Sequence, residues 1–133
     1  MNANFKVGAA IAVGFGSLLW GSAAYADGWP TTVQGNWSVV GNQSTGTLSI
    51  TQPSSSLNCK PISGSIYGNS IQGFYCPASG RIGFARLLSS GVPFQYYQGN
   101  LSQTGNILRI GGNFAVFNSS GGSLGEYNFS ATK

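Results

Sequence analysis

After residue 26, the apolar side chains recur at every second position, in short runs separated by clusters of glycine, asparagine and serine. Residues 47–51 show the pattern clearly, because Leu48 and Ile50 alternate with hydroxyl-bearing residues. No segment in this part of the chain has apolar residues at i, i+3 and i+4 over a helical length. Alternation with a period of two is typical of half-buried β-strands, so the sequence predicts an all-β domain.

The runs predict eight strands, at residues 35–40, 47–51, 62–66, 71–75, 81–86, 94–101, 106–117 and 126–131. The connections have the length of hairpins, which favours antiparallel pairing throughout. We expect a tight turn at Gly68-Asn69 and a bend or bulge at Gly111-Gly112. Eight antiparallel strands can close into a single up-and-down barrel without exposed edges, and a two-sheet β-sandwich is the alternative closure.

The first 26 residues have the features of a secretory signal peptide. Lys6 supplies the positive charge, residues 7–20 are apolar, and Ala24-Tyr25-Ala26 supplies the small residues before a cleavage site. We therefore expect residues 1–26 to be removed, a flexible lead at 27–34 and a barrel domain at 35–133. The predicted location is the periplasm or the cell exterior, with no membrane span after cleavage.

Cys59 and Cys76 are the only cysteines, and they lie on either side of the predicted hairpin around Gly68. An even pair in an exported chain favours a structural disulfide. A hairpin centred between Tyr67 and Gly68 would set the two cysteines opposite each other, whereas a Gly68-Asn69 turn would offset them by two positions. The spacing is not that of a redox Cys-x-x-Cys pair.

Histidine and acidic side chains, which commonly serve in catalysis and metal binding, are nearly absent. The chain has no histidine, and its two acidic residues are Asp27 and Glu126. A histidine-based triad, a carboxylate dyad and a cluster of histidine, cysteine and aspartate around a metal are therefore excluded. We expect no catalytic residue, no metal site and no cofactor, and hence a protein that is not an enzyme.

The basic residues after the signal peptide are scattered singly along the chain: Lys60, Arg81, Arg86, Arg109 and Lys133. A nucleic-acid-binding protein would be expected to cluster them on one element, so no nucleic acid partner is predicted. Charged residues make up only 6% of the chain. Low charge leaves little to oppose association between copies, so a homo-oligomer is compatible with the composition.

The opening Gly35-Asn36-Trp37 and the following Gly46-Thr47-Leu48-Ser49-Ile50 resemble the start of the avidin family, within the wider group of lipocalin-type barrels. Residues 71–75 loosely match a later Phe-x-Gly-x-Tyr strand. The resemblance implies a small β-barrel with Trp37 buried at one end and a late-strand arginine, Arg86 or Arg109, packed over it. It does not imply biotin binding, because Val39 stands where avidins have a ligand-contacting asparagine.

Tyr96 and Tyr97 are consecutive in a predicted strand, so their side chains face opposite sides and only one can enter the core. The outward tyrosine could stack on a sugar ring or on a neighbouring subunit. With Gln98 beside it and Tyr75 from the same aromatic inventory, the candidate ligand-binding residues are Tyr75, Tyr96, Tyr97 and Gln98.

Arg86 has the parity of Ile82 and Phe84, so its side chain is expected on their face of the strand. In the core it would need a partner, and Glu126 is the one acid of the strand region. The alternative is that Arg86 lies at a strand end and reaches water.

Two functions are compatible with these features. The first is an exported, non-catalytic barrel that binds a small apolar or glycan ligand in its mouth or on its surface. The second is a structural or surface subunit that assembles outside the cell. Large core residues, among them Ile62, Ile66, Phe84 and Phe114, could fill a narrow barrel and leave no internal cavity.

Overall fold

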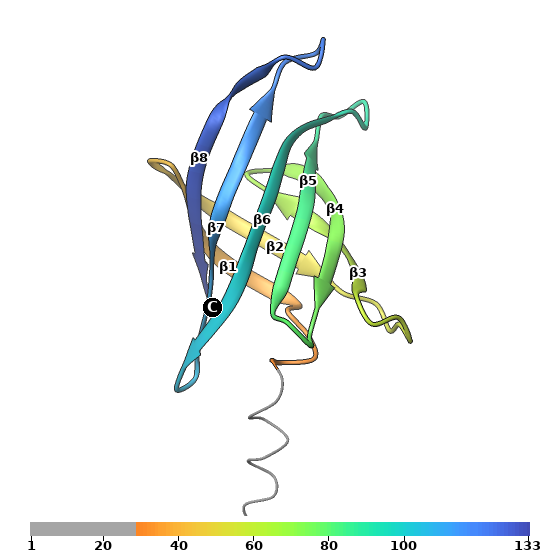
Figure 1. Ribbon diagram of the computed structural model, residues 1–133, viewed down its shortest axis with the longest axis vertical. Helices are drawn as coiled ribbons and strands as arrows, with labels where there is room; N and C mark the ends of the chain where they lie inside the picture. Colours follow the sequence, from red (N-terminus) through yellow and green to blue (C-terminus); the bar gives the residue numbers. More distant parts are fainter. Residues whose placement is uncertain (1–28) are drawn as a thin grey trace, which may run out of the picture.

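In the computed structural model the chain forms a closed antiparallel barrel with strands in the order β1 to β8 (Figure 1). The structure describes residues 29–133; the predicted signal peptide and its cleavage site before Asp27 lie outside the described residues. The strands are β1 (Gly35–Gly41), β2 (Ser44–Thr51), β3 (Lys60–Ile66), β4 (Asn69–Cys76), β5 (Arg81–Leu87), β6 (Pro93–Thr104), β7 (Ile107–Phe117) and β8 (Ser123–Thr132). The prediction of an eight-stranded up-and-down barrel is confirmed.

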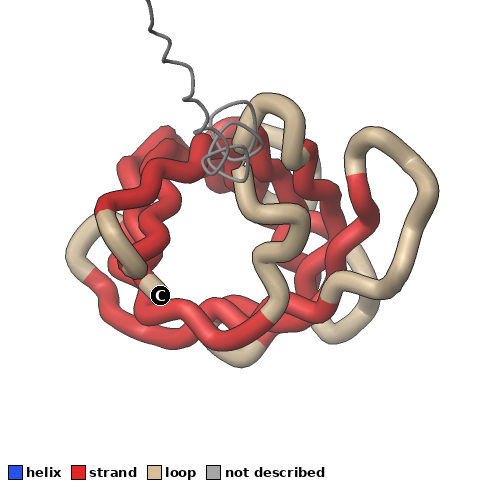
Figure 2. Tube along the Cα trace, turned by 90° about the horizontal axis from the view of Figure 1, so that it is seen from below, coloured by secondary structure: helices blue, strands red, loops and turns tan. Residues whose placement is uncertain are grey.

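Closure of the barrel comes from the pairing of the first and last strands. Ser38 to Gly41 of β1 lie opposite Thr132 to Phe129 of β8, so the sheet returns on itself instead of splitting into two layers. Viewed along the barrel, the strands form a ring (Figure 2). The alternative of a two-sheet sandwich is therefore wrong, because the β1–β8 pairing leaves no sheet edge at the ends of the strand order.

The barrel has two different ends. The turns β1–β2, β3–β4, β5–β6 and β7–β8 lie at one end, which we call the mouth. The other three connections and residues 29–34 lie at the opposite end, which we call the closed end; the chain also finishes there at Lys133 (Figure 1).

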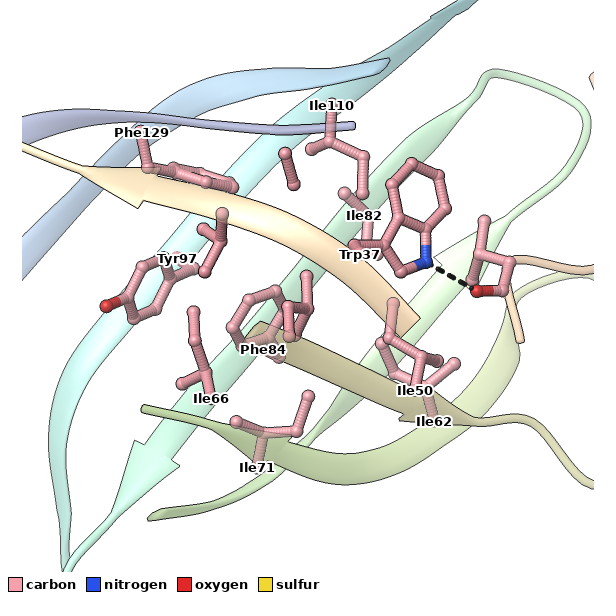
Figure 3. Close-up of a cluster of buried hydrophobic side chains, with 14 of the residues drawn as sticks. Trp37, Ile50, Ile62, Ile66, Ile71, Ile82, Phe84, Tyr97, Ile110 and Phe129 are labelled. Carbon is pink, nitrogen blue, oxygen red and sulfur yellow. Dashed lines mark hydrogen bonds between the residues drawn. The ribbon is translucent and has the colours of Figure 1, made fainter. Parts of the chain in front are cut away.

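The barrel interior is filled with large apolar side chains (Figure 3). Trp37, Phe84, Phe114 and Phe129 are all less than a tenth exposed. Tyr97 lies between Phe84 and Phe114, with ring centres 4.8 Å and 4.7 Å away. The three rings therefore form a continuous stack near the mouth. Such stacking stabilises the fold beyond the contribution from burial of apolar surface.

Residues 29–34, predicted as a flexible lead, lie against the closed end. The buried Trp37 indole N–H donates to the Val33 carbonyl oxygen at 2.9 Å (Figure 3), and the Tyr75 hydroxyl donates to the Pro30 carbonyl oxygen at 2.6 Å. Val33 itself is completely buried. The lead segment thus supplies both apolar cover and the hydrogen-bond acceptors that two buried aromatic side chains require.

The β3–β4 turn is one residue earlier than predicted. It consists of Tyr67 and Gly68, both with positive φ (49° and 83°), and Ile66 pairs with Asn69. The prediction of a Gly68-Asn69 turn is wrong, because Tyr67 takes a left-handed conformation and forms the turn together with Gly68. Positive φ at both central positions is the geometry of a type I′ hairpin turn.

The predicted disulfide between Cys59 and Cys76 is confirmed. The observed turn gives the register in which Lys60 lies opposite Tyr75, so the adjacent Cys59 and Cys76 face each other at the closed end. The bond ties the start of β3 to the end of β4.

A bend or bulge was predicted at Gly111-Gly112, but the register is continuous there and shifts at the mouth instead. The register shifts lie between Arg86 and Leu87 on the β5–β6 ladder, and between Val116 and Phe117 on the β7–β8 ladder. Gly112 serves close packing instead, since a Cβ at this position would lie 1.9 Å from the Gln98 carbonyl oxygen of the neighbouring strand. Only glycine allows the two backbones to approach so closely.

The cation packed over Trp37 is a lysine. Lys133 Nζ lies 5.9 Å from the centre of the Trp37 ring and donates to the Gln34 carbonyl oxygen. The expectation that Arg86 or Arg109 covers Trp37 is wrong, because Arg86 lies at the mouth and Arg109 is exposed on β7. The last residue of the chain, which no strand pattern singles out, reaches this position.

Residues 29–133 contain no helix that is long and apolar enough to cross a membrane.

Candidate functional site

The outer face of β4 to β8 carries a groove of about 470 Å³. Its floor consists of the small outward residues Gly83 and Ala85 on β5 and Ala115 on β7. Larger side chains from the neighbouring strands stand on either side of this floor. Small residues therefore separate large ones along the sheet, and the difference in side-chain size produces the hollow.

Aromatic side chains form the apolar walls of the groove. Phe74 and Tyr96 are about half exposed, with 46% and 50% of their surface accessible. Phe74 pairs with Gly83, and its ring covers that position: a Cβ at Gly83 would lie 3.2 Å from Phe74 Cε1. Tyr96 packs edge-on against Phe117, with ring centres 5.6 Å apart. These contacts restrain both exposed rings while leaving a face of each accessible to a ligand.

Polar side chains complete the rim of the groove. Gln72, Gln98 and Asn113 project from β4, β6 and β7, and Glu126 from β8 lies opposite Ala115. None of these four side chains hydrogen-bonds to another residue among 29–133 in the structure. Glu126 is also the sole carboxylate side chain between residues 29 and 133. The groove thus combines flat apolar surfaces with amide and carboxylate groups that are free to bind a ligand.

The four residues predicted to bind a ligand do not form one site. Tyr96 and Gln98 lie together in the outer groove. Tyr97 points into the barrel and is 3% exposed, as required by its parity opposite to Tyr96. Tyr75 is fully buried at the closed end, where its hydroxyl binds Pro30. Tyr75 is therefore not accessible to a ligand.

Phe74, which the sequence reasoning missed, had a readable signal. It precedes Tyr75 just as Tyr96 precedes Tyr97, so the same rule of alternating faces requires one of the two to be exposed. Tyr75 shares the parity of the buried Ile71 and points inward, and Phe74 consequently points outward. The remaining groove residues on β7 and β8 could be assigned only once the register of those strands was known.

The mouth contains a second cavity, of about 380 Å³, arranged around Arg86. Arg86 Nε and Nη2 donate to Asn69 Oδ1 at 3.0 Å and 2.6 Å, and Nη1 donates to Gln95 Oε1 at 3.1 Å. The Tyr97 hydroxyl donates to the same Gln95 oxygen at 2.8 Å. Both predictions for Arg86 were partly right: it is on the inner face and near a strand end, but its partners are amides and not Glu126.

Aromatic rings hold the guanidinium group from two sides. Its central carbon lies 5.2 Å from the centre of the Tyr67 ring and 5.1 Å from that of Phe94. Phe94 has this position because of the register shift: Arg86 pairs with Gln95 and Leu87 with Pro93, which leaves Phe94 as the extra residue. A bulge commonly redirects a side chain in this way.

Tyr67 is itself supported across the mouth. Its hydroxyl donates to the Ser44 carbonyl oxygen at 2.7 Å, and its ring rests on Gly46, where a Cβ would lie 2.5 Å from the ring. Tyr67 is therefore fixed over the start of β2 and forms one wall of the mouth.

Burial raises the pKa of Tyr97 to about 12, an effect that the positive charge of Arg86 partly opposes. The Tyr97 hydroxyl therefore stays protonated at neutral pH and remains a donor to Gln95. Burial also raises the pKa of Tyr75 to about 12.

No protein-family model matches this chain, and no curated protein matches it in sequence.

Proposed function

We propose that this protein is an exported, non-catalytic barrel that binds glycans in the groove on the outer face of β4 to β8. The observation that carries the proposal is the pair of exposed rings, Phe74 on β4 and Tyr96 on β6, on either side of the small β5 residues Gly83 and Ala85. A sugar ring has apolar C–H faces that stack on aromatic rings and hydroxyl groups that bind amides and carboxylates. The groove offers both kinds of partner side by side.

The dimensions of the groove support a small ligand or the end of a longer one. Its volume falls in the range of small-molecule sites, about 300–1000 Å³. Gln98 and Asn113 pair across β6 and β7, so their amides lie next to each other on the rim beside Tyr96. A ligand enclosed in the barrel interior has less support, because core side chains fill that space.

The predicted export also belongs to this proposal. The Cys59–Cys76 disulfide is compatible with an oxidising compartment, and the signal-like residues 1–26 point to the periplasm or the cell exterior. Kinship with avidin-type or lipocalin-type barrels is proposed on the same footing. It is supported by the Gly35-Asn36-Trp37 opening, by the buried position of Trp37 and by the closed eight-stranded barrel.

A glycan array followed by calorimetry with the best oligosaccharide tests the proposal. Tyr96→Ala should weaken binding about tenfold or more, equivalent to about 1.4 kcal/mol. Tyr96→Phe, which keeps the ring, should retain most of the affinity. The matched control is Val40→Ala, since Val40 is 42% exposed on the outer face of β1 and does not line the groove. The proposal would be rejected if no glycan binds, or if Val40→Ala loses as much glycan affinity as Tyr96→Ala.

Self-assembly through the same face is a second candidate function. Phe74, Tyr96 and Leu124 are exposed on β4, β6 and β8, and few charges oppose a second copy. Sedimentation of the wild-type protein and the Tyr96→Ala variant separates the two functions. A dimer or larger assembly that is lost in the variant, without glycan binding in the wild type, would favour the structural role.

A further inference from the structure

We infer that the mouth holds a second binding site, in which Arg86 binds the carboxylate group of a small organic anion. This site is separate from the proposed glycan groove, because Arg86 lies on the inner face of β5 and the groove lies on the outer face of the sheet. The inference rests on how the guanidinium group is held and on the charge that surrounds it.

The first argument is the number of unused donors. A guanidinium group has five N–H bonds. Three of them are used, by Nε and Nη2 toward Asn69 and by Nη1 toward Gln95. One N–H therefore remains on each of Nη1 and Nη2. Asn69 Oδ1 and Gln95 Oε1 already accept two hydrogens each, so neither is suited to accept a further one. Two remaining donors on one planar group match the two oxygens of a carboxylate.

The second argument is the charge of the mouth. The cavity is lined by glycine, by uncharged polar residues, by aromatic rings and by Val116, and Arg86 is its one charged side chain. Glu126, the sole carboxylate side chain among residues 29–133, lines the outer groove instead. The neutral amides hold the guanidinium group without neutralising it. A half-buried cation with such neighbours attracts an anion more strongly than an exposed one does, because less water screens it.

The third argument is the rigidity of the arrangement. The β3–β4 turn contributes Tyr67, the start of β4 contributes Asn69 and the start of β6 contributes Phe94 and Gln95, and all four contact Arg86. The β5–β6 register shift and the positive φ of Tyr67 both contribute to this geometry. Because the long Arg86 side chain is already held in one position, less conformational entropy is lost when a ligand binds.

The walls of the mouth define the rest of the ligand. Tyr67, Phe114 and Tyr127 line the cavity together with Tyr97, so a flat apolar body attached to the carboxylate fits beside them. The ligand class is therefore a small aromatic or unsaturated carboxylate.

Titration with benzoate, followed by the backbone amide resonances of the intact barrel, tests the inference. Benzoate should shift resonances at the mouth, around Tyr67 to Asn69 and Gln95 to Tyr97. Its neutral isostere benzamide should bind at least about tenfold more weakly. Arg86→Gln should abolish the shifts, whereas Arg81→Gln, an exposed arginine on the same strand, should leave them unchanged.

A second variant covers the case in which Arg86→Gln fails to fold. Asn69→Asp keeps the size and the accepting oxygen but adds a negative charge beside the guanidinium group, so benzoate affinity should fall at least about tenfold. The inference is overturned if benzoate causes no shifts at the mouth, if benzamide binds as well, or if Asn69→Asp binds benzoate like the wild type. Tyr96→Ala should not change benzoate binding, so this result is independent of the glycan proposal.

Discussion

The two ends of the barrel use similar residues for different purposes. At the closed end, the polar atoms of Trp37 and Tyr75 donate to backbone carbonyl oxygens of Val33 and Pro30, and both side chains are almost completely buried. At the mouth, the polar atoms of Arg86 and Tyr97 bind side-chain amides. At the closed end, the hydrogen bonds satisfy buried polar atoms of the core through the backbone of the segment that covers them. Hydrogen bonds among side chains at an open rim hold a charged group in place and leave part of it available.

The first prediction concerns the closed end and has the largest expected effect. Trp37→Ala should lower the free energy of unfolding by about 3–5 kcal/mol, because it removes a large buried ring and leaves a cavity. Thermal unfolding followed by circular dichroism measures this. Phe74→Ala on the outer face is the contrasting variant and should cost far less, since that ring is nearly half exposed. A Trp37→Ala protein as stable as the wild type would contradict the role of Trp37 as a buried core residue of the closed end.

The disulfide also belongs to the closed end, and its removal has the next largest effect. Replacing Cys59 and Cys76 together by serine should reduce the free energy of unfolding by about 3 kcal/mol in the chain-entropy model, given their separation of 17 residues. Chemical denaturation with and without reductant measures the same quantity in the wild type. If reduction leaves the denaturation midpoint unchanged, the closed end does not depend on this bond.

A smaller effect should appear at alkaline pH and involves both ends. Burial raises the pKa of Tyr75 and of Tyr97 to about 12, above the unfolded value of 10.0. The folded state therefore resists losing these protons, so stability should be constant below about pH 10 and should fall as the pH rises toward 12. Denaturation midpoints measured across this range, with tyrosinate absorbance alongside, test the sign.

Single variants show which end of the barrel causes the loss of stability at alkaline pH. Tyr75→Phe and Tyr97→Phe should each reduce the alkaline loss of stability, because each removes one buried hydroxyl. Tyr96→Phe is the control, since that ring is half exposed in the folded state. A loss of stability that persists in the Tyr75→Phe, Tyr97→Phe double variant would show that other groups cause it.

Much of the candidate site could be read from alternation along a strand. The opposite faces of Tyr96 and Tyr97 followed from their being consecutive, and the same rule places one of Phe74 and Tyr75 on the outer face. Alternation tells which residues share a face, but it does not tell which face is the core when both carry aromatic rings. This is why Tyr75 was grouped with Tyr96 although it is fully buried.

By itself, the sequence determined the all-β class, the burial of Trp37 and the Cys59–Cys76 disulfide, because these depend on periodicity and on pairing within one hairpin. Only the tertiary structure decided that β1 pairs with β8, that Lys133 covers Trp37, and that Asn69 and Gln95 meet at Arg86. The physical reason is that register between strands is a cooperative property of the closed sheet. Moving a turn by one residue, as from the predicted Gly68-Asn69 to the observed Tyr67-Gly68, changes every cross-strand partner on the ladder by two positions.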